Sequence, residues 1–195
     1  MAGPEAVNER DKEAAPAMPT LNKDLSLAEG FLRTDQYQLT MAQMYFKLGF
    51  HEETVQFDHF FRRYPDYGSH QAGYCVNAGL EWLIRWLQDT RITRQDITSL
   101  RNHCTPSGER VFGDDFLAWL GDRGSFGELT IRSIPEGRVI HPDGPVTSVQ
   151  GPLALCQILE TPLLNQLNYQ ILTATKAARV KNSARGRPVL EFGIR

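Results

Sequence analysis

The chain has 195 residues, enough for one packed domain and part of a second. Its hydrophobic content of 41% and charged content of 23% are those of an ordinary globular protein, and a formal net charge of -2 gives no general attraction to nucleic acid or anionic lipid. The sequence has neither the charged start and apolar core of a signal peptide nor a run of about 18 apolar residues, so no transmembrane span is expected. Its three separated cysteines form no CxxC pair and no zinc-ligand spacing. They favour a reduced cytoplasmic protein without a metal site.

Residues 1–30 are predicted to form a disordered leader. They are rich in Ala, Glu, Pro, Asn and Lys, and no aromatic residue precedes Phe31. Such a segment cannot bury enough apolar surface to offset the entropy lost when it becomes ordered. The folded part is therefore expected to begin near Phe31.

Residues 31–150 are predicted to form one α/β domain. A helix should start at Thr34 or Asp35, because both are helix-start residues and apolar side chains recur at helical spacing behind them up to Gly49. Residues 54–62 alternate between apolar and polar side chains, which predicts a half-buried strand. The remaining expected elements are a short strand at 74–76, helices at 78–88, 92–103 and 113–120, and β-type runs at 129–134, 138–140 and 146–149.

Residues 151–195 are predicted to form a long helix and one strand of a second, incomplete domain. The helix should run from about residue 152 to 181, and Pro162 inside it removes a backbone donor and should kink or restart it. Its buried stripe is expected to contain Leu159, Leu163, Leu167, Ile171, Ala174 and Ala178.

In the expected strand at 188–195, alternation places Glu191, Gly193 and Arg195 on one face. This face suits a polar ligand site, or it is the solvated side of an edge strand, and the pattern leaves both readings open. Because a single strand needs neighbours, the chain is expected to be incomplete or to be completed by another chain.

A series of short motifs covers nearly all of residues 31–195. They are LRTDQYQLTMA at 32–42, FFRR at 60–63, AGL at 78–80, PEG at 135–137, GPL at 151–153, LETPLLN at 159–165, ATKAAR at 174–179 and LEFGIR at 190–195. In this order and spacing they resemble the amino-terminal part of the nicotinate phosphoribosyltransferase family. The resemblance implies an α+β amino-terminal domain of a type II phosphoribosyltransferase, followed by the first helix and strand of an irregular β/α barrel.

The resemblance also implies a reaction and an assembly. Nicotinate and phosphoribosyl pyrophosphate would give nicotinate mononucleotide and pyrophosphate, with Mg2+ on the phosphates and with ATP hydrolysis coupled through a phosphorylated histidine. Family members usually form homodimers, in which the amino-terminal domain of one subunit helps to cover the site of the other. The phosphorylated histidine, the phosphoribosyl loops and most of the barrel would lie beyond Arg195, so this chain is expected to be inactive alone and to hold no catalytic residue.

By the same resemblance, Tyr37 is expected to stack on nicotinate, in the site of the partner subunit, unless it is a core or capping aromatic. Arg195 would contact the nicotinate carboxylate or the phosphoribosyl phosphates, and Glu191 would position that arginine.

Four residues of the long helix are further candidates for substrate binding. Lys176 and Arg179 lie three positions apart on one helix face, where they bind phosphate or serve only the helix surface. Thr161 and Asn165 line the pocket, or they restart and cap the helix after the proline.

Two other functions remain open. The chain could be a non-catalytic truncated or split-gene subunit that associates with a full-length partner. It could also belong to a relative that uses quinolinate or nicotinamide, although the Thr-Asp-x-Tyr and Glu-Phe-Gly-x-Arg motifs argue for nicotinate.

Overall fold

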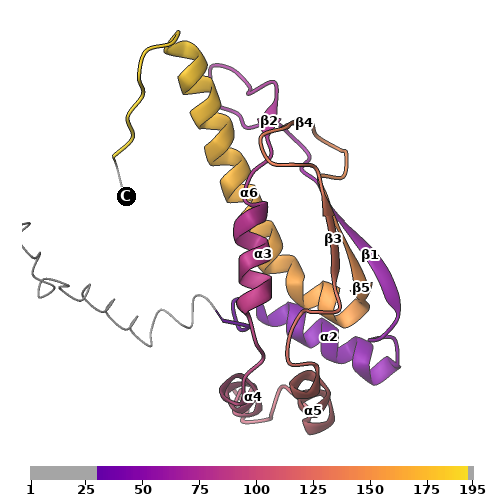
Figure 1. The fold of residues 1–195 in the computed structure, drawn as a ribbon. Helices are drawn as coiled ribbons and strands as arrows, with labels where there is room; N and C mark the ends of the chain where they lie inside the picture. Colours follow the sequence, from indigo (N-terminus) through magenta and orange to yellow (C-terminus); the bar gives the residue numbers. More distant parts are fainter. Residues whose placement is uncertain (1–29, 193–195) are drawn as a thin grey trace, which may run out of the picture.

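A single long helix, α6 (Leu153–Ser183), packs against two helices and three strands (Figure 1). The computed structural model describes residues 30–192. Within them α6 contacts helices α2 (Gln36–Leu48) and α3 (Leu80–Asp89) and several strands. The long helix predicted from the sequence is confirmed, but Pro162 lies inside it without restarting it.

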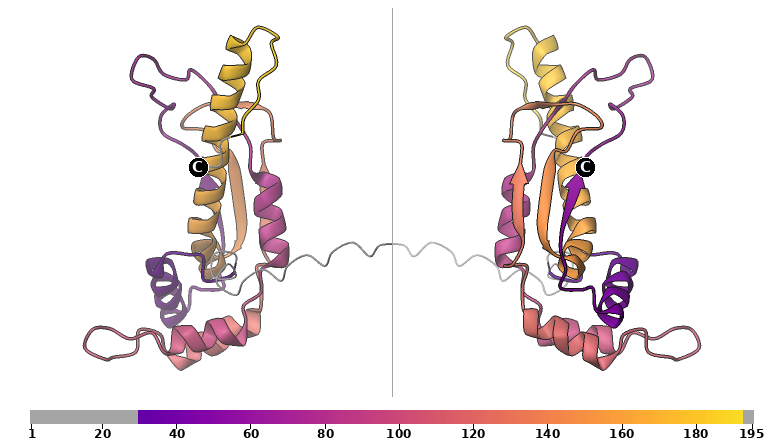
Figure 2. Two further views of the ribbon diagram at one scale, coloured as in Figure 1. Left: turned by 90° about the vertical axis from the view of Figure 1, so that its left-hand side faces the viewer. Right: turned by 90° about the vertical axis from the view of Figure 1, so that its right-hand side faces the viewer.

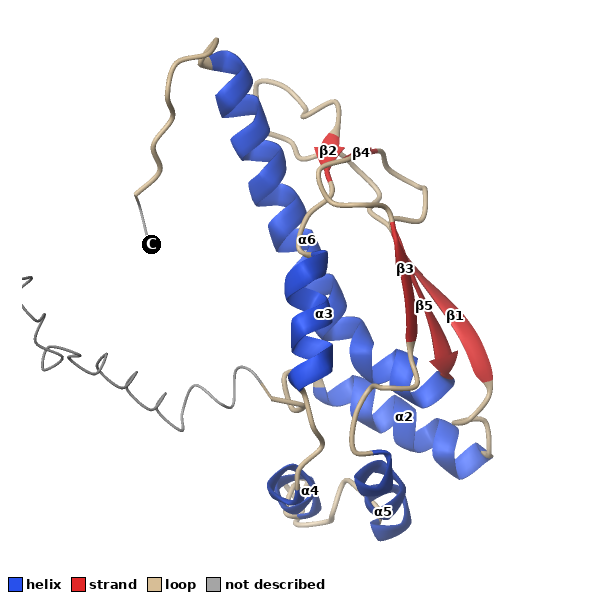
Figure 3. Ribbon diagram, in the orientation of Figure 1, coloured by secondary structure: helices blue, strands red, loops and turns tan. Residues whose placement is uncertain are grey.

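The strands form two antiparallel sheets (Figure 3). The larger sheet has the order β1-β5-β3, formed by β1 (Thr54–His59), β5 (Thr147–Pro152) and β3 (Thr130–Ser133), and Phe57 and Ile131 both pair with Val149. The smaller sheet joins β2 (Cys75–Val76) to β4 (Val139–Ile140). Strand β1 ends at His59 rather than at residue 62, because the first residue of β5, Thr147, already lies opposite His59.

Two short helices, α4 (Arg94–Arg101) and α5 (Asp114–Arg123), lie together at one end of the molecule (Figure 2). The sequence predicted both. Helix α4 begins after a capping box, in which Thr93 and Asp96 each accept a hydrogen bond from the backbone N–H of the other. Helix α3 begins at Leu80 rather than at residue 78, because Gly79 has a left-handed conformation that a helix cannot continue.

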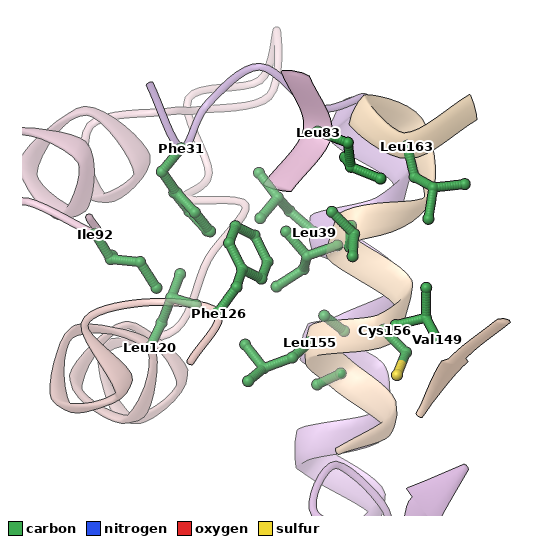
Figure 4. Close-up of a cluster of buried hydrophobic side chains, with 14 of the residues drawn as sticks. Phe31, Leu39, Leu83, Ile92, Leu120, Phe126, Val149, Leu155, Cys156 and Leu163 are labelled. Carbon is green, nitrogen blue, oxygen red and sulfur yellow. The ribbon is translucent and has the colours of Figure 1, made fainter. Parts of the chain in front are cut away.

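The hydrophobic core lies where α2, α5, α6 and the loop around Phe126 meet (Figure 4). Phe31, Leu120 and Leu155 are completely buried there. Burying one such side chain contributes about 1.5–3 kcal/mol, so this cluster holds the helices together. The stripe expected on α6 is buried from Leu159 to Ile171 and half-buried at its two alanines. Core side chains come from both sides of the expected domain boundary at residues 150 and 151, and that boundary stays a prediction.

The predicted terminal strand is wrong for the part that the structure describes. Residues 188–192 form no strand, and Leu190 and Phe192 are 83% and 92% exposed. A strand needs a neighbour for its backbone N–H and C=O groups, and no described strand pairs with this segment. Residues 1–29, the expected leader, and residues 193–195 lie outside the described part of the chain.

Strand β1 packs on α6 through a buried histidine. His59 is 4% exposed, and its Nε2 donates to Oδ1 of Asn168 at 3.0 Å. Because Nε2 carries the proton, Nδ1 is the acceptor, and it is buried without a partner among the described residues. Burial lowers the pKa of His59, and the hydrogen bond to Asn168 opposes this effect only in part.

Gly79, the N-cap of α3, lies close against α6. Its φ is 100°, and a Cβ built there would lie 2.8 Å from Cβ of Gln170 on α6. We expect Gly79→Ala to reduce the free energy of unfolding by about 1–3 kcal/mol, through backbone strain and this contact together. Gly49→Ala is the matched control, because Gly49 has a φ of 81° with nothing within 4 Å of its Cβ position. Urea unfolding should show a larger loss for Gly79→Ala, and equal losses would contradict the close approach.

The burial of His59 predicts a pH dependence of stability. As the pH falls below about 6.5, the imidazole of His59 takes up a proton in the unfolded chain but remains neutral in the folded chain, where burial lowers its pKa. The free energy of unfolding should therefore fall with pH in this window, by at most about 1.4 kcal/mol per pH unit. His59→Gln should remove this component in urea titrations between pH 7 and pH 5, whereas His103→Gln, at an exposed position, should not. An unchanged profile in His59→Gln would contradict the assignment.

Candidate functional site

The segment that precedes and opens α2 is bound to the first half of α6 by side-chain hydrogen bonds. Asp35 is the N-cap of α2, but its carboxylate makes no capping bond. Instead it accepts a hydrogen bond from α6. Its negative charge also interacts favourably with the positive end of the α2 dipole. The bonds between the two elements are Arg33 Nη2 to Asn165 Oδ1 at 2.9 Å, Thr34 Oγ1 to the Ile158 carbonyl at 3.0 Å, and Thr161 Oγ1 to Asp35 Oδ2 at 2.9 Å.

Tyr37 combines an exposed ring with a tethered hydroxyl. Its side chain is 53% exposed, and its hydroxyl accepts a hydrogen bond of 3.0 Å from Nε2 of Gln38. Gln38 is completely buried, and its Nε2 also lies 3.3 Å from Oγ1 of Thr161. The ring therefore faces outward in a fixed position, as a side chain that stacks on an aromatic ligand should.

A buried pair of glutamines supports this arrangement. Gln157 on α6 donates to Oε1 of Gln38, and it is itself held by Tyr45 at 3.1 Å and by Glu160 at 3.0 Å. Buried amides stabilise one arrangement only when their hydrogen bonds are satisfied, and these two are. The sequence analysis did not single out either residue. The only feature of the sequence that could have identified them is a polar side chain at a position where the helical repeat predicts an apolar one.

Thr161 and Asn165 face the opening segment of α2. The alternative that they restart and cap a helix is wrong, because α6 is continuous through both. Each instead hydrogen-bonds to the segment that carries Tyr37. A direct role of these two side chains in binding a ligand stays a prediction.

The basic candidates lie elsewhere on α6. Lys176 is 15 positions beyond Thr161, about 22 Å along the helix axis. Lys176 is exposed, whereas Arg179 donates to the carbonyl of Ala72 at 2.6 Å and lies over the ring of Tyr67 at 5.6 Å. Within this chain the structure therefore does not bring these two residues together with Tyr37. Glu191 is exposed beyond the end of α6, and Arg195 lies outside the described residues.

A cavity of about 700 Å³ is lined by residues of strand β1, of the segment after it and of α6. Its walls are mainly apolar, with Phe57, Phe61 and Leu163 among them, and His59 also lines it. Cys156 lines it as well, but burial raises the pKa of this thiol to about 11, so it is protonated and is a poor nucleophile.

Residues 30–192 contain no group of three or more His, Cys, Asp or Glu side chains placed to hold a metal ion. None of the helices described is both long enough and apolar enough to cross a bilayer. What the site offers is an oriented aromatic ring on a rigid pair of helices.

Known proteins that this chain resembles were found both by sequence and by structure. A family model described as the nicotinate phosphoribosyltransferase (NAPRTase) N-terminal domain matches residues 32–168. Nicotinate phosphoribosyltransferase of Caenorhabditis elegans is 38% identical over 176 residues, 90% of this chain and 30% of that protein. The Bacillus subtilis protein of the same name is 39% identical over 173 residues, 89% of this chain and 32% of that protein.

The structural matches agree with the sequence matches. The crystal structure of human nicotinic acid phosphoribosyltransferase superposes with a TM-score of 0.69 at 34% identity, over 83% of this chain and 31% of that one. Nicotinate-nucleotide pyrophosphorylase from Pyrococcus furiosus, at 21% identity and a TM-score of 0.55, shares the fold. The chain spans about a third of the length of these relatives. The mixed α/β fold is confirmed, and the chain belongs to the nicotinate phosphoribosyltransferase family, whose amino-terminal domain it contains.

Proposed function

We propose that this chain serves a nicotinate phosphoribosyltransferase in NAD biosynthesis and supplies the aromatic side chain that holds the pyridine ring. The enzyme joins nicotinate to phosphoribosyl pyrophosphate, forming nicotinate mononucleotide and pyrophosphate with hydrolysis of ATP. The observation that carries the proposal is Tyr37, whose ring is half exposed while its hydroxyl is tethered to buried Gln38. A ring fixed in this way can stack on the pyridine without losing side-chain entropy when the ligand binds.

Tyr37 points outward rather than into a pocket of its own chain, which favours a shared site. It does not line the 700 Å³ cavity beside β1, and it is 53% exposed. We therefore propose a homodimer in which the Tyr37 ring closes the nicotinate pocket of the partner subunit. An enclosed pocket strengthens the polar contacts to the nicotinate carboxylate because it excludes water.

The phosphate chemistry belongs, in this proposal, to parts of the enzyme outside residues 30–192. Residues 30–192 contain no group of three or more His, Cys, Asp or Glu side chains that could hold a metal ion, and we derive no step through Mg2+. All five histidines are described, and they are engaged in structural contacts such as the 2.7 Å bond between Tyr64 and His141. We propose that ATP, Mg2+ and most contacts to phosphoribosyl pyrophosphate are supplied by the portion that the relatives have and this chain lacks.

The remaining candidates are ranked by what their side chains already do. Arg179 is committed to the carbonyl of Ala72, so exposed Lys176 is the better candidate for a phosphate. Arg195 remains the proposed contact to the nicotinate carboxylate or the phosphoribosyl phosphates, with Glu191 positioning it. Thr161 and Asn165 support the pocket by holding the Tyr37 segment. We propose a cytoplasmic location, which suits three free cysteines.

The proposal and its non-catalytic alternative differ in the size of the native product. An antibody raised to residues 31–195 would report the mass of the protein in its source cells. An enzyme of the relatives' length has about three times the 22.1 kDa of this chain. A product of 22.1 kDa with no complementary chain would favour the non-catalytic subunit.

Removing the Tyr37 ring tests its proposed role. The assay uses the complete enzyme, with residues 1–195 followed by the portion that the relatives have. We expect Tyr37→Ala to raise the KM for nicotinate about 10-fold or more, which corresponds to about 1.4 kcal/mol. Tyr37→Phe keeps the ring and is the matched control, expected within about threefold of the wild type because it loses one hydrogen bond. An unchanged KM in Tyr37→Ala would refute stacking.

Competing pyridines test the substrate class. Nicotinate should be turned over faster than nicotinamide or quinolinate at equal concentration, because the proposed pocket is built for one carboxylate on one aromatic ring. Initial rates with the three compounds measure this directly. Preference for quinolinate or nicotinamide would move the enzyme to another branch of the pyridine phosphoribosyltransferases.

A further inference from the structure

Pro162 opens a gap in the backbone hydrogen bonds of α6. In an α-helix the N–H of each residue donates to the carbonyl four positions earlier, and proline has no N–H. The carbonyl of Ile158 therefore has no helical donor, although α6 runs through both residues without a break. Ile158 is completely buried and Pro162 is buried too, so water has little access to this carbonyl. A buried carbonyl released in this way needs a donor from outside the helix.

Thr34 supplies that donor. Its Oγ1 lies 3.0 Å from the carbonyl oxygen of Ile158, in a partly buried hydrogen bond between residues 124 positions apart. Thr34 directly precedes Asp35, the N-cap of α2, and Tyr37 lies in the first turn of that helix. The bond therefore fixes where α2 begins relative to α6, and with it the place of the Tyr37 ring.

The buried bond from Gln157 to Gln38 also joins α2 to α6, but two other neighbouring hydrogen bonds fix this position less firmly. Those from Arg33 to Asn165 and from Thr161 to Asp35 are both exposed, where water can replace either partner. Only the bond from Thr34 satisfies a carbonyl that the proline has left without a helical partner. Moving Thr34 away would leave that buried carbonyl without a donor. The bond therefore favours one position of the opening segment on α6.

We propose that Pro162 and Thr34 act as a matched pair that positions Tyr37, which makes Thr34 a positioning residue for nicotinate. This inference rests on the proposed function of Tyr37. The proline creates the acceptor, and the threonine uses it to dock the opening segment on α6. The pair thus links a missing helical hydrogen bond in one part of the sequence to a ligand contact in another.

A double-mutant cycle in the complete enzyme tests the pair. Thr34→Val keeps the shape of the side chain and removes the donor, and Thr34→Ser is the conservative control that keeps it. Pro162→Ala restores an N–H that can satisfy Ile158 from within the helix. We expect Thr34→Val to raise the KM for nicotinate about fivefold, the size of one lost hydrogen bond. The kcat and the KM for phosphoribosyl pyrophosphate should change less than about twofold, and Thr34→Ser should match the wild type.

The coupling between the two sites decides the question. In the Pro162→Ala background the effect of Thr34→Val on the nicotinate KM should shrink to about twofold or less, because the carbonyl now has a helical donor. Equal effects of Thr34→Val in both backgrounds, or equal changes in kcat and in both KM values, would overturn the inference. If Tyr37→Ala raises the nicotinate KM but Thr34→Val does not, the positioning role alone fails. If the wild-type enzyme does not turn over nicotinate, or Tyr37→Ala has no effect, the proposed function fails and the inference falls with it.

Discussion

The contact between the start of α2 and the first half of α6 is the interaction on which the rest of the structure depends. Helix α6 is continuous across Pro162, and the carbonyl of Ile158, one turn before this proline, accepts a hydrogen bond from Thr34. Helices α2 and α6 also share the hydrophobic core around Leu39 and Leu155. The strands then pack on α6, partly through the buried bond between His59 and Asn168. Apolar burial stabilises the pair, and the polar bonds set its register.

In the proposed enzyme, this arrangement lets the amino-terminal domain contribute to the reaction through the ring of Tyr37. The buried amides of Gln38 and Gln157 hold the hydroxyl of Tyr37 and leave its ring exposed. An aromatic platform that is already ordered contributes to binding without a further loss of side-chain freedom. In the proposed enzyme the phosphate and metal chemistry lies in the remaining portion, while this domain orients the pyridine ring.

Local patterns in the sequence predicted most of the elements, and contacts distant in sequence account for what they missed. The spacing of Leu39 and Ala42 marked α2, the alternation around Phe57 marked β1, and the motif series marked the family. The hydrogen bond from Thr34 to Ile158 was out of reach, because only the folded chain brings these residues together. The burial of Gln38 was out of reach as well, because it depends on the partner Gln157 on α6. The terminal strand failed for the same reason, since pairing, and not alternation alone, makes a strand.

The most direct test of this account is a crystal structure of the complete enzyme with nicotinate bound. We predict that the pyridine ring lies against the ring of Tyr37, with the hydroxyl of Tyr37 still bonded to Gln38 and that of Thr34 to the Ile158 carbonyl. Nicotinate bound without contact to any Tyr37 ring of the assembly would contradict the proposed function. Contact with Tyr37 after the Thr34 bond has broken would retain the function and contradict the positioning of the ring by Pro162 and Thr34.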